Sequence, residues 1–363
     1  MKLRHYLTCS LIAASGLVSV ACGQPETEKT GTASPDARPS TPIQWRTTST
    51  YPSTLPLIGT MGKRVTVEIG KVSGGNITLK FYEPGVLAPP FETFDAVKYG
   101  AVESGWSTPG YWAGKEPALQ LFASVPFGPS APEYMGWFDY GGGKQLFDEI
   151  YHTHGIHSVI CGMTPPEAAG WYKKEMKSIE DFKGLKIRFF GLGAKVLEEI
   201  GAAPQLIAGG EIYQALELGT IDASEYAMPV VDYNMGFYEV ADHYYFPGWH
   251  QQSTFFELMF NLDAWNGLSE TQQHQINTAC AANVRYGISE GEALQPDAIE
   301  KLKTKGVKIH MWSPEILAAL ETAWRKVATD MAEDDPNFAR VWQSLQTFRA
   351  RYKSWGDIGY LKE

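Results

Sequence analysis

The sequence predicts an α/β protein with two lobes around a ligand cleft, followed by long C-terminal helices. Strand-like segments alternate with helical segments in two successive blocks. After the N-terminal region, roughly 320 of the 363 residues remain for a folded body, which is enough for two lobes of ordinary domain size. A ligand site is therefore expected where the two lobes meet.

The first lobe is predicted over residues 43–165, completed by part of 247–363, and the second lobe over 166–246. Strands are predicted over residues 44–48, 77–82, 101–106, 158–160, 185–190 and 221–226. Helices are predicted over residues 55–73, 91–99, 192–200 and 211–218. The region 247–363 is predicted to be mainly helical, with long helices over 270–305 and 314–355. These could brace the two lobes, form a dimer face, or only pack on their own lobe.

Residues 1–22 have the pattern of an export signal. Lys2 and Arg4 precede an apolar run that is too short for a membrane anchor helix. Small residues before Cys22 are typical of lipoprotein processing, although cleavage by an ordinary signal peptidase also fits. Residues 23–42 are polar and are predicted to form a flexible tether. We therefore expect a periplasmic or otherwise extracytoplasmic protein, tethered to the membrane through lipid if Cys22 is acylated.

Charge and composition limit the partners. The net charge of −10 argues against nucleic acid, but it does not exclude an anionic ligand, because the local charge at a site matters more. Cys161 and Cys280 lie in the folded body; an oxidising compartment would allow a disulfide, but we expect two buried free thiols. His152, His154 and His157 form a cluster without a recognised metal-binding spacing, so we expect a solvated or core cluster.

Sequence motifs for catalysis are missing. The sequence contains no nucleophile elbow, no phosphate-binding glycine loop and no metalloprotease motif. We therefore predict that the protein is not an enzyme. A secreted hydrolase that uses His154 or Glu167, and a ligand-sensing protein that feeds a receptor, stay as alternative functions.

A set of short segments points to one family. They are ASVPFG at 123–128, GWYKKE at 170–175, GLKIR at 184–188, GEIYQALE at 210–217, GTIDA at 219–223, GFY at 236–238 and YYFPGW at 244–249. In combination they resemble the solute-binding subunits of tripartite ATP-independent periplasmic (TRAP) transporters, in the branch that binds 2-oxo acids, lactate and related carboxylates with a metal ion. The resemblance implies a two-lobe periplasmic binding protein fold that closes on its ligand, with TRAP membrane subunits as partners. A homodimer is also possible.

Arg188 is the first candidate for a ligand contact. It ends the predicted strand 185–188, and open α/β sheets place ligands at the carboxyl ends of strands. A guanidinium can hold a carboxylate through two parallel hydrogen bonds. The resembled family uses an arginine in this strand for the carboxylate of the ligand.

The resemblance also implies a metal site. Glu225, the main-chain carbonyl of Tyr226 and the side chain of Gln251 match positions that hold the ion in the family. Glu167 matches a position that contacts both metal and ligand, although it could instead be a rim residue. Oxygen ligands of this kind suit Na⁺ or Ca²⁺, and a second carboxylate at Glu167 favours Ca²⁺.

Other residues are expected near the ligand. A tyrosine hydroxyl at Tyr111 could bond a carboxylate while its ring excludes water. The remaining candidates for ligand contact or support are Trp112, Phe189, Asp232, Asn234 and Trp249. Pyruvate, a related 2-oxo acid, or lactate is the expected ligand, and a larger sugar acid or aromatic acid is the alternative.

Overall fold

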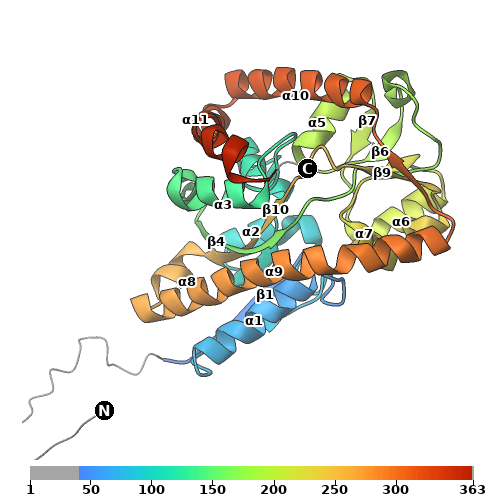
Figure 1. The fold of residues 1–363 in the computed structure, drawn as a ribbon. Helices are drawn as coiled ribbons and strands as arrows, with labels where there is room; N and C mark the ends of the chain where they lie inside the picture. The colour runs from blue at the N-terminus through green and yellow to red at the C-terminus, as the bar shows by residue number, and fades with distance from the viewer. Residues whose placement is uncertain (1–40, 362–363) are drawn as a thin grey trace, which may run out of the picture. The chain divides into compact units, whose positions relative to one another are not determined.

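Two β-sheets organise the chain, which the computed structural model describes over residues 41–361 (Figure 1). The first sheet has the order β2-β1-β3-β10-β4. Its strands are β1 (Ile43–Ser49), β2 (Ile77–Phe81), β3 (Ser104–Ser107), β4 (Ile156–Thr164) and β10 (Thr254–Asn261). Strand β1 pairs in parallel with β2 and β3, whereas β10 runs antiparallel between β3 and β4.

The second sheet has the order β11-β9-β5-β8-β6-β7. Its strands are β5 (Gly170–Tyr172), β6 (Lys186–Arg188), β7 (Ala203–Gln205), β8 (Ala223–Ser224), β9 (His243–Phe246) and β11 (Lys308–Met311). Strand β6 is parallel to both β7 and β8, and β9 is parallel to β11. The chain leaves the first sheet after Thr164 and enters the second at Gly170, so each sheet forms the centre of one lobe.

Helices surround each sheet. Those joined to the first sheet are α1 (Thr60–Val72), α2 (Thr93–Lys98), α3 (Ala131–Tyr140), α4 (Gly143–Thr153) and α8 (Leu262–Asn266), with the 3₁₀ turns η1 (Pro90–Glu92), η2 (Pro109–Trp112) and η3 (Pro117–Phe122). Those joined to the second are α5 (Gly191–Glu199), α6 (Gly209–Glu217) and α7 (Pro229–Met235), with η4 (Ile179–Phe182) and η5 (Phe237–Glu239). The C-terminal helices are α9 (Glu270–Thr304), α10 (Pro314–Asp334) and α11 (Pro336–Gly359).

Helix α9 contacts both lobes. It begins with a capping box in which Ser269 and Gln272 satisfy each other's backbone N–H groups. Near its middle, the buried amide of Asn283 donates hydrogen bonds to the backbone oxygens of Met61 (3.2 Å) and Cys161 (2.7 Å) in the first lobe. Further along, its Gln295 side chain accepts a hydrogen bond from the N–H of Val230 in α7 at 3.0 Å. Of the three arrangements considered for the long helices, α9 therefore adopts the bracing one.

The other two C-terminal helices divide between the lobes. Helix α10 packs on α5, and α11 packs on η3, α3 and α4 (Figure 1). No helix within residues 41–361 is both long and apolar enough to cross a membrane. The export signal at 1–22, the tether predicted at 23–42 and Cys22 fall before or at the start of the part that the structure describes.

Two features of the last third differ from the sequence-based prediction. Strand β10 lies in a region that was predicted to be mainly helical, and β11 joins the second sheet. The sequence of β10, TFFELMFN, is buried along nearly its whole length. A strand that is buried on both faces has no alternation of polar and apolar residues to reveal it.

Cys161 and Cys280 form a disulfide, so the expectation of free thiols is wrong. Cys161 lies in β4 and Cys280 in α9, and both are fully buried. The bond joins the long helix to the first sheet across a sequence separation of 119 residues. Sequence spacing alone could not pair them, because only the packing of α9 on β4 brings the two positions together.

Candidate functional site

Arg188 and Glu225 meet at the carboxyl ends of two neighbouring parallel strands. Arg188 ends β6, and Glu225 follows directly after β8, with Arg188 in register with Ser224. The Arg188 Nη1 atom lies 2.8 Å from Glu225 Oε2 and 2.6 Å from the backbone oxygen of Glu225. The N–H of Phe190 donates to the same Oε2 at 3.1 Å. This is the edge of an α/β sheet at which ligands bind.

The Arg188–Glu225 pair is charged although it is buried. The side chains are 1% and 0% exposed. Burial alone would raise the pKa of Glu225, but the Arg188 charge, His250 and the Phe190 N–H outweigh burial and hold this pKa below its ordinary value. Burial likewise opposes the charge on Arg188, but the Glu225 carboxylate outweighs it and raises the pKa of Arg188. A buried ion pair of this kind is costly to desolvate, so its presence indicates a specific role more than added stability.

Glu167 and Gln251 line the same cavity as Arg188. Glu167 lies between β4 and β5, and Gln251 between β9 and β10, in two of the segments by which the chain passes between the sheets. The hydroxyl of Thr254 donates to Glu167 Oε1 at 3.0 Å and accepts from Gln251 Nε2 at 2.7 Å. Burial, together with the nearby Glu225 carboxylate, raises the pKa of Glu167 well above its ordinary value.

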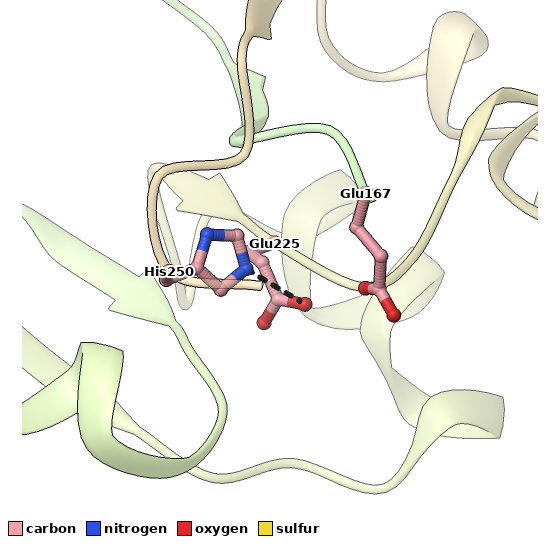
Figure 2. Close-up of side chains that lie close together, drawn as sticks. All are labelled: Glu167, Glu225 and His250. Atoms are coloured by element: carbon pink, nitrogen blue, oxygen red, sulfur yellow. Dashed lines mark ion pairs between the residues drawn. The ribbon is translucent and has the colours of Figure 1, made fainter. Parts of the chain in front are cut away.

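Several buried polar atoms of this site have no hydrogen-bond partner among the described residues. They are Glu167 Oε2, Glu225 Oε1, Gln251 Oε1 and both ring nitrogens of His250. Figure 2 shows Glu167 and His250 reaching toward Glu225 from separate loops. Potential ligand atoms of Glu167, Glu225 and His250 all lie within 4.8 Å of one another. Because buried polar atoms are normally paired, this set fits a cation that would be held mainly by oxygen atoms.

A small cavity lies beside these charged groups. Its volume of about 20 Å³ has room for about one water molecule, so a larger ligand requires the lobes to open or the walls to move. The lining side chains are Tyr51, Ile58, Thr108, Tyr111, Glu167, Arg188, Phe190, Tyr226, Ala227, Gln251, Thr254 and Phe256. Apolar and aromatic walls with a few convergent polar groups are typical of a small-molecule site.

Two aromatic rings on the cavity wall lie so close to a glycine that any side chain at that position would collide with them. The Phe190 ring lies edge-on to Tyr111 at 5.2 Å, and a Cβ atom at Gly110 would lie only 2.3 Å from it. The Tyr226 ring lies 5.2 Å from the Arg188 guanidinium. A Cβ atom at Gly209 would lie 2.2 Å from the Tyr226 hydroxyl, so both rings need these glycines to reach their positions.

The structure brings together six of the residues singled out in the sequence. Arg188, Glu167, Tyr111, Tyr226 and Gln251 line the cavity, and Glu225 lies next to it. Eight residues of the site were not singled out: His250 and, on the cavity wall, Tyr51, Ile58, Thr108, Phe190, Ala227, Thr254 and Phe256. His250 and Thr254 flank Gln251 in the sequence, and Phe190 follows Phe189, so proximity to the motif was the available signal.

Trp112, Asp232 and Asn234 lie away from the cavity wall, contrary to expectation. The buried indole of Trp112 donates to Glu257 Oε1 at 2.7 Å, inside the first lobe. Asp232 is fully buried and accepts hydrogen bonds from Trp171 and Tyr244, and burial raises its pKa to about 7. Asn234 is exposed, and its amide donates to the backbone oxygen of Val230, its own helix neighbour. None of the three therefore lines the cavity, although Asp232 keeps one buried oxygen, Oδ1, without a hydrogen-bond partner in the described chain.

Phe189 and Trp249 pack behind the site. Their rings stack on each other with centroids 5.8 Å apart, and both contact the ring of His250. Neither lines the cavity, because consecutive residues of an extended segment point to opposite sides and Phe190 takes the inner position. Both pack on His250; for Phe189 a contact with the carbon skeleton of the ligand was expected, and for Trp249 packing against the ligand region or the hinge.

The three clustered histidines do not gather around a common point. His152 and His157 are hydrogen-bonded to each other through Nε2 and Nδ1 at 3.0 Å. His154 lies instead beside Glu116, with Nε2 3.6 Å from Oε2. Burial, followed by the nearby His152, lowers the pKa of His157 to about 3. The cluster is therefore part of the first lobe's packing, as expected from the sequence.

Comparison with known proteins identifies the family. Residues 50–335 match the bacterial extracellular solute-binding proteins, family 7. The chain belongs to this family. This chain is 33% identical, over 364 residues, to the monocarboxylate 2-oxoacid-binding periplasmic protein of Nostoc sp. The alignment covers 99% of this chain and 97% of that protein. The predicted resemblance to TRAP solute-binding subunits is confirmed.

Solved structures of family 7 relatives share the fold. A TRAP periplasmic solute-binding protein from Colwellia psychrerythraea, with bound calcium and pyruvate, superimposes with a TM-score of 0.84 at 32% identity, covering 87% of this chain and 97% of that chain. One from Pseudoalteromonas atlantica, with bound sodium and pyruvate, gives a TM-score of 0.83 at 31% identity, covering 86% and 96%. The predicted two-lobe α/β fold of a TRAP solute-binding protein is therefore confirmed.

Proposed function

We propose that this TRAP solute-binding protein captures a small 2-oxo monocarboxylate such as pyruvate, or lactate, together with Na⁺ or Ca²⁺. The observation that carries the proposal is the buried Arg188–Glu225 pair next to unpartnered carboxylate and amide oxygens. The relatives that bind 2-oxo acids, two of them with a metal ion and pyruvate, support this ligand class.

In this proposal Arg188 binds the carboxylate of the ligand. Its guanidinium now contacts Glu225, so its side chain must share or exchange this contact when the ligand enters. Two parallel hydrogen bonds from the fork of the guanidinium would fix the orientation of the acid. The ring of Tyr111 and that of Phe190 would exclude water from the carbon chain.

The cation would be held by Glu225, Glu167, Gln251 and the carbonyl of Tyr226. Two carboxylates and an anionic ligand in one buried space would repel one another, and a bound cation supplies the opposite charge that makes their burial tolerable. Glu167 and Gln251 lie in segments that connect the sheets, so contacts to them also favour the closed arrangement of the lobes.

The wider setting completes the proposal. We place the mature chain outside the cytoplasm, where it would deliver its ligand to TRAP membrane subunits without acting as an enzyme. This placement depends on the export pattern of residues 1–22 and on the family of extracellular proteins. Acylation of Cys22 and a homodimer stay predictions.

Thermal melting of the metal-stripped protein tests this function. Pyruvate, lactate and longer 2-oxo acids are added in turn, with Na⁺, Ca²⁺ or neither. We expect the largest rise in melting temperature with pyruvate or lactate in the presence of a cation, because a ligand that binds only the folded state stabilises it. Arg188→Lys keeps the charge but loses the fork, so this rise should disappear.

Arg46→Lys is the matched control. Arg46 forms an exposed ion pair with Glu103 at 2.7 Å, and it does not line the cavity. It should leave the ligand-dependent rise unchanged. A wild-type protein whose melting temperature does not respond to any of these acids would contradict the proposed ligand class.

A further inference from the structure

His250 is a buried histidine whose ring nitrogens form no hydrogen bond within the described part of the chain, although Nε2 lies within ion-pair distance of Glu225. It is 1% exposed, and neither Nδ1 nor Nε2 has a hydrogen-bond partner there. Its ring is fixed from behind by Phe189 and Trp249, with centroids 4.6 and 5.5 Å away. A buried polar group without a hydrogen-bond partner costs free energy. A bound ion or molecule that interacts with the imidazole nitrogens would offset this cost.

The open edge of this ring faces the cleft carboxylates. His250 Nε2 lies 3.6 Å from Glu225 Oε1, which is too long for a hydrogen bond. Glu167 completes a set of three donors within 4.8 Å of one another (Figure 2). When ligand atoms lie about 2 Å from a shared ion, they are separated from each other by roughly 3 to 4 Å. A cation between these groups could reach all three with small side-chain movements.

We propose that His250 Nε2 is a direct ligand of the cation, so that the cleft has a mixed nitrogen and oxygen donor set. This inference rests on the cation site of the proposed function and adds to it. Imidazole suits borderline divalent ions such as Zn²⁺ and Co²⁺, whereas Na⁺ and Ca²⁺ prefer oxygen ligands alone. The site therefore accepts Zn²⁺ or Co²⁺ and binds them more tightly than Ca²⁺.

Calorimetric titration of metal-stripped protein with Zn²⁺ and with Ca²⁺ tests the donor set. Two other histidine pairs, His152–His157 and His243–His310, lie within hydrogen-bond distance and could bind Zn²⁺ by themselves. All titrations therefore use a His152→Gln/His310→Gln background. We expect one Zn²⁺ per chain, bound at least about tenfold more tightly than Ca²⁺.

His250→Gln is the decisive variant, since it keeps a polar side chain of similar length but removes the nitrogen ligand. Zn²⁺ affinity should fall at least about tenfold, and Ca²⁺ affinity should change less than about threefold. His154→Gln is the matched control, because His154 also lies 3.6 Å from a glutamate but outside the cavity. It should change neither affinity.

Pulsed EPR of Cu²⁺-loaded protein in the same background gives a readout that does not depend on the His250 variant folding, with an ion that imidazole binds well. We expect a coupling to a histidine nitrogen, identified by its change on labelling histidine with ¹⁵N. Absence of this coupling, or Zn²⁺ affinity that is unchanged in His250→Gln, would overturn the proposal and leave His250 as a neighbour that only positions Glu225.

The two levels of the proposal fail differently. If Ca²⁺ or Na⁺ still promotes pyruvate binding while Zn²⁺ binds no more tightly than Ca²⁺, only the nitrogen ligand is wrong. If pyruvate binds equally well with no cation and no cation binds, both the nitrogen ligand and the metal part of the proposed function are wrong.

Discussion

Two glutamates, Glu225 in the cleft and Glu257 in the first lobe, are equally buried and yet differ in charge. Both are 0% exposed. Glu257 accepts hydrogen bonds from the Trp112 indole at 2.7 Å and from the Ser158 hydroxyl at 2.6 Å, so each of its oxygens has a neutral donor. Burial raises its pKa to about 7. Glu225 instead lies beside Arg188, its pKa is lowered, and its Oε1 has no partner in the described chain.

The difference shows that the partners of a buried carboxyl group, more than its burial, separate a structural role from a binding role. Neutral donors satisfy both oxygens of Glu257 but do not outweigh its burial, which favours the protonated form, so this group stabilises the first lobe without a ligand. A fixed positive charge keeps Glu225 ionised while one oxygen stays available. An ionised and incompletely satisfied group is unfavourable unless another molecule or ion joins it.

Glu225→Gln is expected to have the largest effect. It removes the charge that pairs with Arg188 and an oxygen that is proposed to bind the cation. Because a charged oxygen ligand is lost, Ca²⁺ affinity measured by calorimetry should fall at least about 100-fold. Breaking the buried ion pair separately lowers the free energy of unfolding by about 3–5 kcal/mol. Glu257→Gln is equally buried and serves as the control with unchanged affinity. A similar loss of Ca²⁺ affinity in both variants would contradict the claim that Glu225 binds the cation and Glu257 does not.

Glu257→Gln should instead change how stability depends on pH. The pKa of Glu257 in the folded protein is about 7, above the ordinary value of 4.5, so folding favours the protonated form. This contribution to stability is fully present below pH 4.5 and is lost as the pH rises from 4.5 to about 7, by about 3 kcal/mol. The variant has no such loss, because an amide does not ionise.

Chemical unfolding at pH 4.5 and at pH 8 measures this effect. The free energy of unfolding of Glu257→Gln, relative to the wild type, should increase between the two pH values. Glu292→Gln, at an exposed position on α9, should follow the wild-type profile. Parallel profiles for Glu257→Gln and the wild type would show that Glu257 is ionised in the folded protein, as Glu225 is.

Phe190→Ala is expected to have the smallest effect and to change selectivity. Its ring forms part of the cavity wall against Gly110 and Tyr111, so truncation makes space for a branched carbon chain. One added methylene group in an apolar pocket is worth about 1–3 kcal/mol. The affinity for 3-methyl-2-oxobutanoate relative to pyruvate should therefore rise about tenfold in a calorimetric competition.

Phe182→Ala removes a ring of the same size from the core of the second lobe, where Phe182 packs on Tyr172 and Trp312. It should lower stability without changing the ratio of the two affinities. If it changes the ratio as much as Phe190→Ala does, the effect is a general loosening of the lobe.

The sequence predicted those parts of the site that follow from strand ends. Arg188 could be found because it comes at the end of a short strand, whereas Glu225 was singled out through the family resemblance; the structure places both at the same edge of the sheet, where parallel strands end. Phe189 was singled out, whereas its neighbour Phe190 lines the cavity, because one position along an extended segment reverses the direction of the side chain. Trp112 follows Tyr111 directly but points into the lobe, where Glu257 accepts its N–H.

Other features depend on tertiary packing that no local pattern encodes. Strand β10 has no polar alternation, so neither it nor its buried Glu257 could be recognised. The position of His250 beside Glu225 depends on how the segment between β9 and β10 packs near the end of β8. The disulfide between Cys161 and Cys280 likewise depends on α9 lying along β4.

Calorimetric titration of pyruvate into metal-stripped and Ca²⁺-loaded protein tests the central claim most directly. That claim is that Arg188 binds the carboxylate while a cation held at Glu225 makes its burial possible. We expect pyruvate to bind at least about tenfold more tightly when Ca²⁺ is present, and Ca²⁺ to bind more tightly by the same factor when pyruvate is present. Equal pyruvate affinity in the two preparations would contradict the claim.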